Sequence, residues 1–160
     1  MKRNVKLSSY SIVLSGLSFV VFCMLFVNAL RRDAPLWMIW SLGIAIFILC
    51  FAALCYSPQS ISIDGNTLNI RRLLKTKHIP LADIADVRLC PPTMAARRIV
   101  GSGGWFGYYG WFSERDLGRY FAYYGKASDC FLVTLRDGRK YMLGCDDAPA
   151  MVEAIKDKMK

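Results

Sequence analysis

Two long runs of apolar residues come before any alternating pattern in this chain. Residues 7–30 and 36–56 contain no Asp, Glu, Lys, Arg or His. A hydrocarbon layer about 30 Å thick requires roughly 20 apolar residues at about 1.5 Å rise per residue, and each run meets that length. The pattern therefore predicts two membrane-spanning helices over about residues 7–30 and 36–56, and the short connection 31–35 makes them a helical hairpin.

A secretory signal peptide is the alternative interpretation of the first run. The basic stretch 1–6 precedes it, and Val27-Asn28-Ala29 could serve as a small-residue cleavage site. The apolar core of a signal peptide normally has roughly 7 to 15 residues, whereas this run is longer and a second run follows it. These two features favour the hairpin.

Serines recur every three or four residues along the first predicted helix and so share one face: Ser8, Ser11, Ser15 and Ser18. Small residues let membrane helices pack closely, so this face could contact the second helix. Equally, each hydroxyl could donate to a carbonyl of its own helix. The sequence leaves both interpretations open.

After residue 57 the chain changes to short runs that alternate polar and apolar positions. Residues 60–63 and 67–71 alternate around the tight-turn sequence Asp64-Gly65-Asn66, which predicts a β-hairpin. Residues 78–81 and 84–89 predict further short strands, with Pro80 at a strand start or a sheet edge. The residues of the hairpin expected to face a core are Ile61, Ile63, Leu68 and Ile70.

A second hairpin and one helix complete the pattern. Residues 131–135 and 140–143 flank Asp137-Gly138 and predict the hairpin. Apolar residues at helical spacing then predict an amphipathic helix over about 148–158. Asp146 or Asp147 would begin this helix, where a carboxylate interacts favourably with the helix dipole; cation binding by these two carboxylates is the weaker alternative. The apolar positions are Met151, Val152, Ile155 and Met159.

A run of strands that ends in a single helix resembles the pleckstrin-homology-like (PH-like) fold. Residues 60–65, 79–84, 101–110 and 132–144 look like those of bacterial PH domain proteins that carry an N-terminal membrane hairpin, and the resemblance covers about 60–158. It implies an α+β membrane-anchored protein, in which a two-helix transmembrane hairpin is followed by a PH-like antiparallel β-barrel or sandwich with one C-terminal helix. It also implies a binding or scaffolding module without known catalysis, and it transfers no set of functional residues.

The expected division is residues 1–56 for the N-terminal tail and hairpin, and 57–160 for the PH-like domain. Within the domain, about 93–128 is expected to be an insertion rich in glycine and aromatic residues. Glycines recur every third residue at Gly101, Gly104, Gly107 and Gly110, and ten aromatic residues lie between Trp105 and Tyr124. This spacing fits neither a dinucleotide-binding fingerprint nor a P-loop.

Three interpretations of the glycine and aromatic segment remain. It could fold back over the domain or the hairpin, or it could contact the membrane. Nucleic-acid stacking is disfavoured, because the second hairpin lacks an RNA-recognition motif and the helices confine the domain to a membrane surface.

Trp and Tyr rings prefer the headgroup level of a bilayer, and a linker of about four residues at about 3.5 Å each would keep the domain within roughly 14 Å of it. We therefore expect Trp105 and Trp111 to lie at the cytoplasmic interface and to help dock the domain on its own helices. The membrane-interface candidates are Trp105, Phe106, Tyr108, Tyr109, Trp111 and Phe112.

Composition and charge extend this picture. The chain of 160 residues is 54% hydrophobic with a formal net charge of +9, which excludes a wholly soluble protein. Two basic groups are candidates for binding anionic lipid headgroups or phosphate, because clustered cations are attracted to anionic leaflets. A solvated basic loop is the alternative. The candidate residues are Arg71, Arg72, Lys75, Lys77, Arg97 and Arg98.

The distribution of positive charge also indicates an orientation. Lys2, Arg3 and Lys6 precede the first helix, and the basic residues after the second helix add to the same side, against Arg31 and Arg32 in the connection. Both termini are therefore predicted to be cytoplasmic, in a bacterial inner membrane. Three of the six cysteines lie in the predicted helices and the other three leave an odd number, so free thiols in a reducing compartment are expected.

The sequence offers little for catalysis. His78 is the sole histidine, which poorly supports an acyl-transfer triad, and the cysteines form no Cys-x-x-Cys pair. We predict no enzyme, no metal site and no cofactor. The predicted function is a membrane-anchored, non-catalytic PH-like module that docks at the cytoplasmic membrane surface and binds or scaffolds a partner; the alternative is a domain that binds anionic lipid or phosphate headgroups. Expected partners are the bilayer, its anionic headgroups, and a membrane protein or a second copy, with no nucleic acid.

Overall fold

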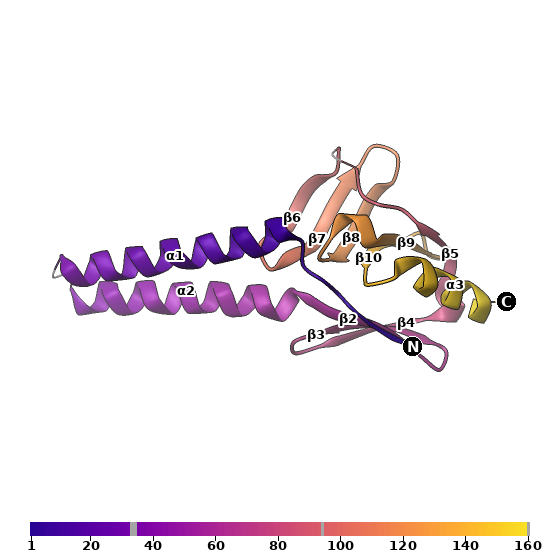
Figure 1. The fold of residues 1–160 in the computed structure, drawn as a ribbon, viewed down its shortest axis with the longest axis horizontal. Helices are drawn as coiled ribbons and strands as arrows, with labels where there is room; N and C mark the ends of the chain where they lie inside the picture. The colour runs from indigo at the N-terminus through magenta and orange to yellow at the C-terminus, as the bar shows by residue number, and fades with distance from the viewer. Residues whose placement is uncertain (33–34, 94, 160) are drawn as a thin grey trace.

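Two helices project from one end of a β-rich body in the computed structural model (Figure 1). The structure describes residues 1–32, 35–93 and 95–159. Parts of three sequence predictions lie outside these residues: positions 33 and 34 of the helical connection, position 94 of the predicted insertion, and the last residue of the predicted domain, 160.

The two apolar runs form α1 (Ser9–Arg31) and α2 (Leu36–Tyr56). Helix α1 begins two residues later than the apolar run because Ser8 acts as its N-cap, where its side chain accepts a hydrogen bond from the Ser11 backbone N–H at 3.1 Å. Both helices have the length and apolar composition to cross a membrane.

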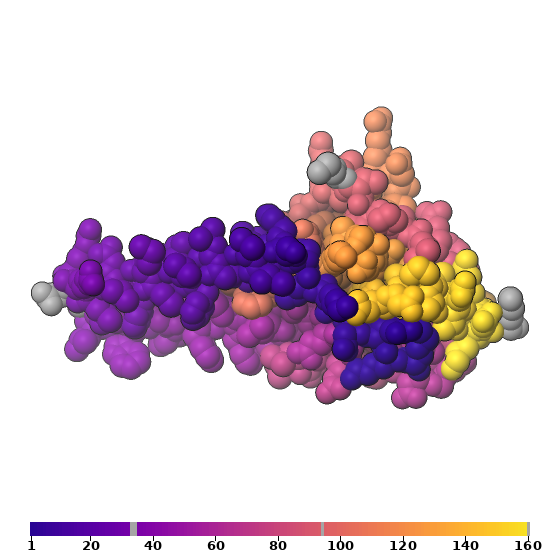
Figure 2. Space-filling view, viewed as in Figure 1, coloured from indigo at the N-terminus to yellow at the C-terminus, as the bar shows by residue number. Residues whose placement is uncertain are grey.

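Almost all of the helical hairpin lies outside the packed body of the protein (Figure 2). Within these two helices, all of whose residues are described, the buried residues are Ser11 of α1 and Ala53 of α2. Large apolar side chains such as Phe19 and Phe47 are more than 60% exposed. A soluble protein rarely exposes so much contiguous apolar surface.

The first sheet has the strand order β1-β2-β3-β4. Its strands are β1 (Lys2–Asn4), β2 (Pro58–Asp64), β3 (Thr67–Arg72) and β4 (Thr76–Pro80). The pairing of β2 with β3 and the place of Pro80 at the end of an edge strand agree with the sequence pattern. Strand β1 was not expected; it pairs antiparallel with β2, with Arg3 opposite Ile61. The helical hairpin is therefore the connection between two neighbouring strands.

The second sheet has the order β5-β9-β10-β8-β7-β6. The strands are β5 (Ile84–Leu89), β6 (Arg97–Gly104), β7 (Gly107–Glu114), β8 (Gly118–Tyr124), β9 (Cys130–Leu135) and β10 (Lys140–Gly144). Short 3₁₀ helices, η1 (Leu81–Asp83) and η2 (Ala127–Asp129), precede β5 and β9. The glycine and aromatic segment thus forms three consecutive strands, β6, β7 and β8, at one edge of this sheet.

The two sheets form an open sandwich, not a closed barrel, because no described strand of one sheet is hydrogen-bonded to the other. The expectation of antiparallel strands is wrong at one place: β8 and β10 pair in parallel, with Phe121 opposite Tyr141. The chain runs from β8 through β9 to β10, so the two paired strands are not consecutive in the sequence. A local sequence pattern does not show that such strands pair.

The main core lies between the sheets and under the C-terminal helix. Residues Ile61, Ile63, Leu68 and Ile70 are buried, as their alternation predicted, and they pack in one cluster with residues of β9 and β10. Helix α3 (Ala148–Met159) buries Met151, Val152 and Ile155 in the same cluster. Burial of this apolar face removes it from water and so stabilises the helix against the sandwich.

The two aspartates before α3 do more than begin the helix. Asp146 pairs with Lys6 at 2.8 Å, and Asp147 pairs with Arg3 at 2.8 Å. These ion pairs join the N-terminal segment to the start of α3, and they account for both carboxylates without a bound cation. Exposed ion pairs of this kind add little stability, but they fix the course of the chain into α1.

Candidate functional site

The four glycines of the aromatic segment stand opposite one another across the β6–β7 hairpin. Gly101 faces Gly110 and Gly104 faces Gly107, so their spacing is symmetric about Trp105 and Phe106. Gly101 and Gly110 have φ values of +128° and +120°. A Cβ on either would overlap the backbone of the opposite strand, so a glycine pair is required for this close approach.

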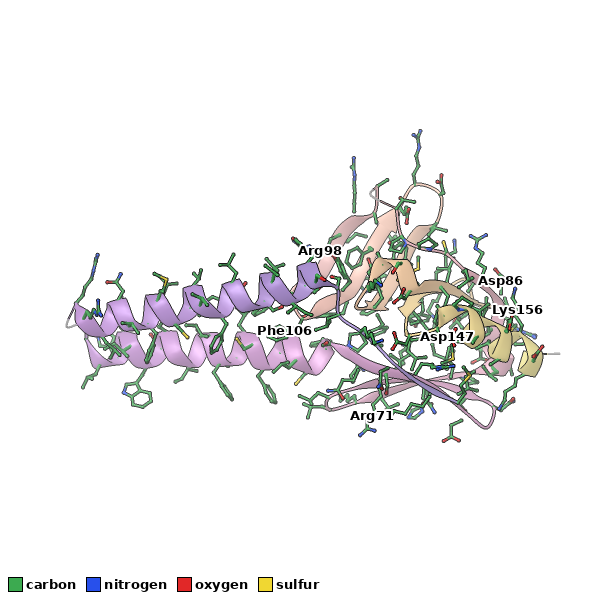
Figure 3. All side chains as sticks on the ribbon, in the orientation of Figure 1. Arg71, Asp86, Arg98, Phe106, Asp147 and Lys156 are labelled. Atoms are coloured by element: carbon green, nitrogen blue, oxygen red, sulfur yellow. The ribbon has the colours of Figure 1, made fainter. Side chains whose placement is uncertain are left out.

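The tip of this hairpin, Gly104–Gly107, contacts the domain ends of both helices. The Phe106 N–H donates to the Ser15 hydroxyl of α1 at 2.9 Å, and the Ser57 hydroxyl, directly after α2, donates to the Phe106 carbonyl at 2.7 Å. Figure 3 shows Phe106 at the domain end of the helices. The backbone of one residue is therefore held on one side by α1 and on the other by the residue that caps α2.

Ring contacts extend the hairpin tip along α1. The Trp105 ring meets Phe22 edge to face, with ring centroids 6.3 Å apart, and it also packs against Phe106 at 5.3 Å. The Ser102 hydroxyl donates to the Trp105 carbonyl at 2.7 Å and closes the turn. Trp105 therefore lies beside the middle of α1, because Phe22 is 13 residues after Ser9, where the helix begins.

The N-terminal segment crosses the other side of the same hairpin. The Ser8 N–H donates to the Gly125 carbonyl at 2.9 Å, and the Lys6 backbone passes so close to Gly125 that a side chain there would overlap it. The Tyr10 ring lies against Gly104. We call the region where the two helices and the N-terminal segment contact the β6–β7 hairpin the junction. Along the N-terminal segment its contacts are continuous from residue 6 to the first turn of α1.

Tyrosines and an arginine complete the junction beneath α2. Tyr56, the last residue of α2, stacks on Tyr109 with centroids 6.1 Å apart. The Arg72 guanidinium lies 5.9 Å from the Tyr56 ring centroid and 5.5 Å from that of Tyr123, within the range of cation–π attraction. Burial raises the pKa of the Tyr123 hydroxyl, and Arg72 opposes that rise. Arg72 Nε is buried without a hydrogen-bond partner among the described residues.

A pocket of about 310 Å³ opens between the end of α2 and the β6–β7 hairpin. One wall is apolar and comes from α2, and the other carries hydroxyl, indole and guanidinium groups. Burial raises the pKa of the Tyr109 hydroxyl, which a hydrogen bond with Ser102 partly offsets. The lining residues are Leu49, Ala52, Ala53, Tyr56, Arg98, Gly101, Ser102, Trp105 and Tyr109.

The turn between β3 and β4 points back toward the helices. Arg72 stands opposite Pro58, two residues after the end of α2, so the turn that follows it lies at the helix end of the first sheet. Leu73 and Leu74 in this turn are 47% and 65% exposed. Lys77 extends over the Tyr141 ring, 4.6 Å from its centroid. None of the four ion pairs among the described residues involves Arg71, Arg72, Lys75 or Lys77.

The predicted interface candidates on β7 lie on two different faces of the strand, because successive side chains of a strand point to opposite faces. Tyr109 packs against the main core and lines the pocket, whereas Tyr108 and Phe112, on the other face of β7, belong to the second core cluster. Phe112 is buried against Tyr120, with ring centroids 6.1 Å apart. Trp111 is 43% exposed and meets Phe121 edge to face.

The junction therefore brings together Trp105, Phe106, Tyr109, Arg72 and Arg98 from the predicted candidates. Arg71, Lys75 and Lys77 lie around the β3–β4 turn, and Arg97 is exposed on the edge strand β6.

Sequence reasoning missed the polar groups of the junction. In the sequence, Ser15 stands out only as one of the serines spaced along one face of the first helix. Ser15 and Ser18 donate to carbonyls of their own helix, those of Ser11 and Leu14. The second role of Ser15, accepting from Phe106, depends on a contact 91 residues away. The symmetry of the four glycines about Trp105 and Phe106 was the one available signal of a hairpin tip at this place.

The remaining reactive side chains have ordinary partners. His78 Nδ1 lies 2.6 Å from the Asn69 amide oxygen. All six cysteines are free, and burial raises the pKa of the Cys145 thiol to about 12, which makes the thiolate scarce at neutral pH. Among the described residues, no group of His, Cys, Asp and Glu side chains is arranged to hold a metal ion.

A family model described as Bacterial PH domain matches residues 59–159. The match begins within β2 and runs through α3, and it leaves β1 and both helices outside. Comparisons with curated proteins and with solved structures find no match.

Proposed function

Since the chain belongs to the bacterial PH domain family, we propose that it is a membrane-anchored, non-catalytic module that its own helices hold at the cytoplasmic membrane surface, where it binds or scaffolds a partner. The helical hairpin spans the bilayer, and the sandwich rests on the membrane at the domain ends of α1 and α2. The module works by placing a binding surface at a fixed distance and angle from the bilayer.

The observation that carries this proposal is the double contact to Phe106. A domain joined to a membrane helix by a flexible linker would sample many orientations, but here Ser15 of α1 and Ser57, directly after α2, hold the N–H and the carbonyl of one residue. Strand β2 begins two residues after α2 ends, which leaves little chain for independent movement. The contacts support a single orientation of the sandwich on its helices.

The β1–β2 pair supports the proposed topology. Since β1 precedes α1 and β2 follows α2, both ends of the helical hairpin return to one sheet and lie on the same side of any bilayer that the helices cross. Both termini lie at the domain end of the molecule (Figure 1). The basic residues Lys2, Arg3 and Lys6, with the β3–β4 turn, favour the cytoplasmic side.

Headgroup binding at the β3–β4 turn is the second candidate function. Leu73 and Leu74 are exposed at the helix end of the sandwich and have basic residues on either side. Apolar side chains can enter the interface while each nearby cation contributes about 1 kcal/mol toward an anionic leaflet. This turn would hold the first sheet at the membrane surface, and the tip of the β6–β7 hairpin would hold the second sheet there.

Strand β6 is the best candidate for the partner surface. It is an edge of the second sheet, and Ile99 and Val100 are 50% and 66% exposed. An exposed edge strand offers unpaired backbone groups and apolar side chains to a strand from a membrane protein or a second copy.

Site-specific photocrosslinking tests the partner proposal. The photoreactive residue p-benzoylphenylalanine is placed at Val100 in the full chain, expressed in its native membrane, with Asp137 on the exposed β9–β10 turn as the matched control. We expect one discrete adduct from Val100 and none from Asp137, and its mass distinguishes a second copy from another protein. Absence of an adduct at Val100, or equal adducts at both positions, would contradict the proposal.

A further inference from the structure

We infer that the pocket between α2 and the β6–β7 hairpin holds one anionic glycerophospholipid, with its phosphate at Arg98 and an acyl chain along α2. This inference rests on the proposed function, because it requires that the helices lie in a bilayer. It concerns a site distinct from the basic β3–β4 turn.

The apolar and polar groups of the pocket follow one another in the same order as the chains and the headgroup of a phospholipid. Leu49 lies seven residues before Tyr56, or about 10 Å along the helix axis, so the apolar wall extends from the helix end toward the bilayer centre. The small side chains of Ala52 and Ala53 leave room for a chain against α2. At the upper end, Tyr56, Ser102 and Arg98 supply polar groups at the level of the headgroups. A phospholipid presents its charge and its chains in the same order.

The charge at the site is positive and uncompensated. Arg98 is the one charged residue among the lining residues, and it belongs to none of the ion pairs of the described residues. Its guanidinium lies beside Gly103, where a Cβ would come within 3.2 Å of Nη1. A guanidinium binds phosphate oxygens with two parallel hydrogen bonds, and Arg72, over the Tyr56 ring, adds positive potential nearby.

Trp105 contributes an unsatisfied donor beside the pocket. Its indole Nε1 is buried and has no acceptor among the described residues. An indole N–H can only donate, and a buried donor without an acceptor is unfavourable by the cost of its desolvation. Trp105 lines the pocket through other atoms of the residue, so an ester or phosphate oxygen of a lipid would reach Nε1 after a shift of the indole ring.

The size of the pocket sets the stoichiometry. A volume of about 310 Å³ is at the small end of ligand pockets, enough for a headgroup with the first part of a chain but too small for several lipids. The rest of the lipid would continue along the exposed surface of α2. One tightly held lipid per chain is the expected result.

Native mass spectrometry of the full-length protein, released from nanodiscs of mixed phosphatidylglycerol and phosphatidylcholine, tests the inference. The wild type is expected to retain one phosphatidylglycerol. Loss of the guanidinium in Arg98→Gln removes a charge-assisted contact and should lower that occupancy about tenfold. Arg97→Gln is the matched control, because the neighbouring residue of a strand points to the opposite face, and it should retain the lipid.

A second variant guards against a folding defect in the first. Ala52→Phe fills the apolar end of the pocket without changing charge, and it should also lower retention of phosphatidylglycerol. Equal retention of both lipids by the wild type, no retained lipid, or equal losses in Arg97→Gln and Arg98→Gln would overturn the inference. Carbonate extraction of the membranes in which the protein is expressed separates the two proposals: a chain that stays in the pellet but retains no lipid in nanodiscs refutes only the pocket, whereas a chain recovered in the wash refutes the proposed function.

Discussion

The backbone N–H of Phe106 donates a hydrogen bond to the hydroxyl of Ser15 at 2.9 Å, across 91 residues of sequence. On its other side, the carbonyl of the same residue accepts from Ser57 at 2.7 Å. The tip of the β6–β7 hairpin is thereby joined to both helices. The sandwich and the helical hairpin form one mechanical unit, and the predictions below address its parts.

Ser15→Ala removes the acceptor of the Phe106 amide. Losing a hydrogen bond at a partly buried site should cost about 1 kcal/mol locally, so hydrogen exchange of a peptide covering 104–108 should become about fivefold faster. Ser18→Ala is the matched control, since Ser18 donates only to the Leu14 carbonyl in its own helix. If both variants exchange at the wild-type rate, the contact does not hold the hairpin tip.

Gly101→Ala should disrupt the β6–β7 hairpin. The positive φ of Gly101 strains any other residue, and the added Cβ would overlap the backbone of β7, so a loss of at least about 3 kcal/mol in unfolding free energy is expected. Gly118→Ala is the control, with φ +70° but open space around its Cα, and it should cost only about 1 to 2 kcal/mol. Denaturant unfolding in detergent compares the two, and equal losses would contradict the close approach of the strands.

Stability should fall at alkaline pH through the buried thiol of Cys145. Burial raises its pKa to about 12 in the folded protein, whereas an unfolded thiol ionises near a pKa of about 8.5. As the pH rises, the unfolded state therefore loses this proton before the folded state does. The free energy of unfolding is then unaffected by this thiol below about pH 8, and above that pH it declines by up to about 1.4 kcal/mol per pH unit. Unfolding at pH 8 and pH 10 should show a smaller decline in Cys145→Ala than in the wild type. An equal decline in both would mean that this thiol is not protected from ionisation.

Both termini should lie on the cytoplasmic side. A green fluorescent protein fused after the C-terminus should fluoresce, an alkaline phosphatase fused at the same place should be inactive, and an N-terminal epitope should resist protease added to spheroplasts. The β1–β2 pair requires the two termini to share a side. Termini on opposite sides would contradict the pairing, and two external termini would contradict the orientation alone.

Several parts of this structure could be predicted from local patterns. The two charge-free runs are long enough to identify α1 and α2, and the alternation around Asp64-Gly65-Asn66 identifies β2 and β3 with their buried residues. The turn sequence between β9 and β10 predicts their hairpin, and apolar residues at helical spacing predict the amphipathic α3. In β2 and β3 alternate side chains are apolar and buried, and in α3 one face is apolar, whereas β9 and β10 are apolar on both faces and are identified by the Asp137-Gly138 turn between them.

The rest depended on contacts between distant residues. Strand β1 has only three residues, too few for a period, and it forms because Ile61 and its neighbours offer a free edge. Strands β6 to β8 gave no alternation, because aromatic residues occupy both faces of β7 and glycines interrupt β6. The parallel pair of β8 and β10 and the bond between Ser15 and Phe106 join segments whose relation no local pattern records.

The depth of Trp105 tests most directly the claim that the hairpin tip fixes the domain at the membrane surface. Replacing Trp37, Trp40 and Trp111 by Phe leaves Trp105 as the single tryptophan of the chain. In liposomes with brominated lipids, its fluorescence should be quenched more strongly by bromines placed near the headgroups than by bromines near the bilayer centre. A Trp111-only variant provides the comparison for a more exposed ring outside the junction. Trp105 fluorescence that no brominated lipid changes would contradict the account, because it would place the hairpin tip in water or in the domain interior.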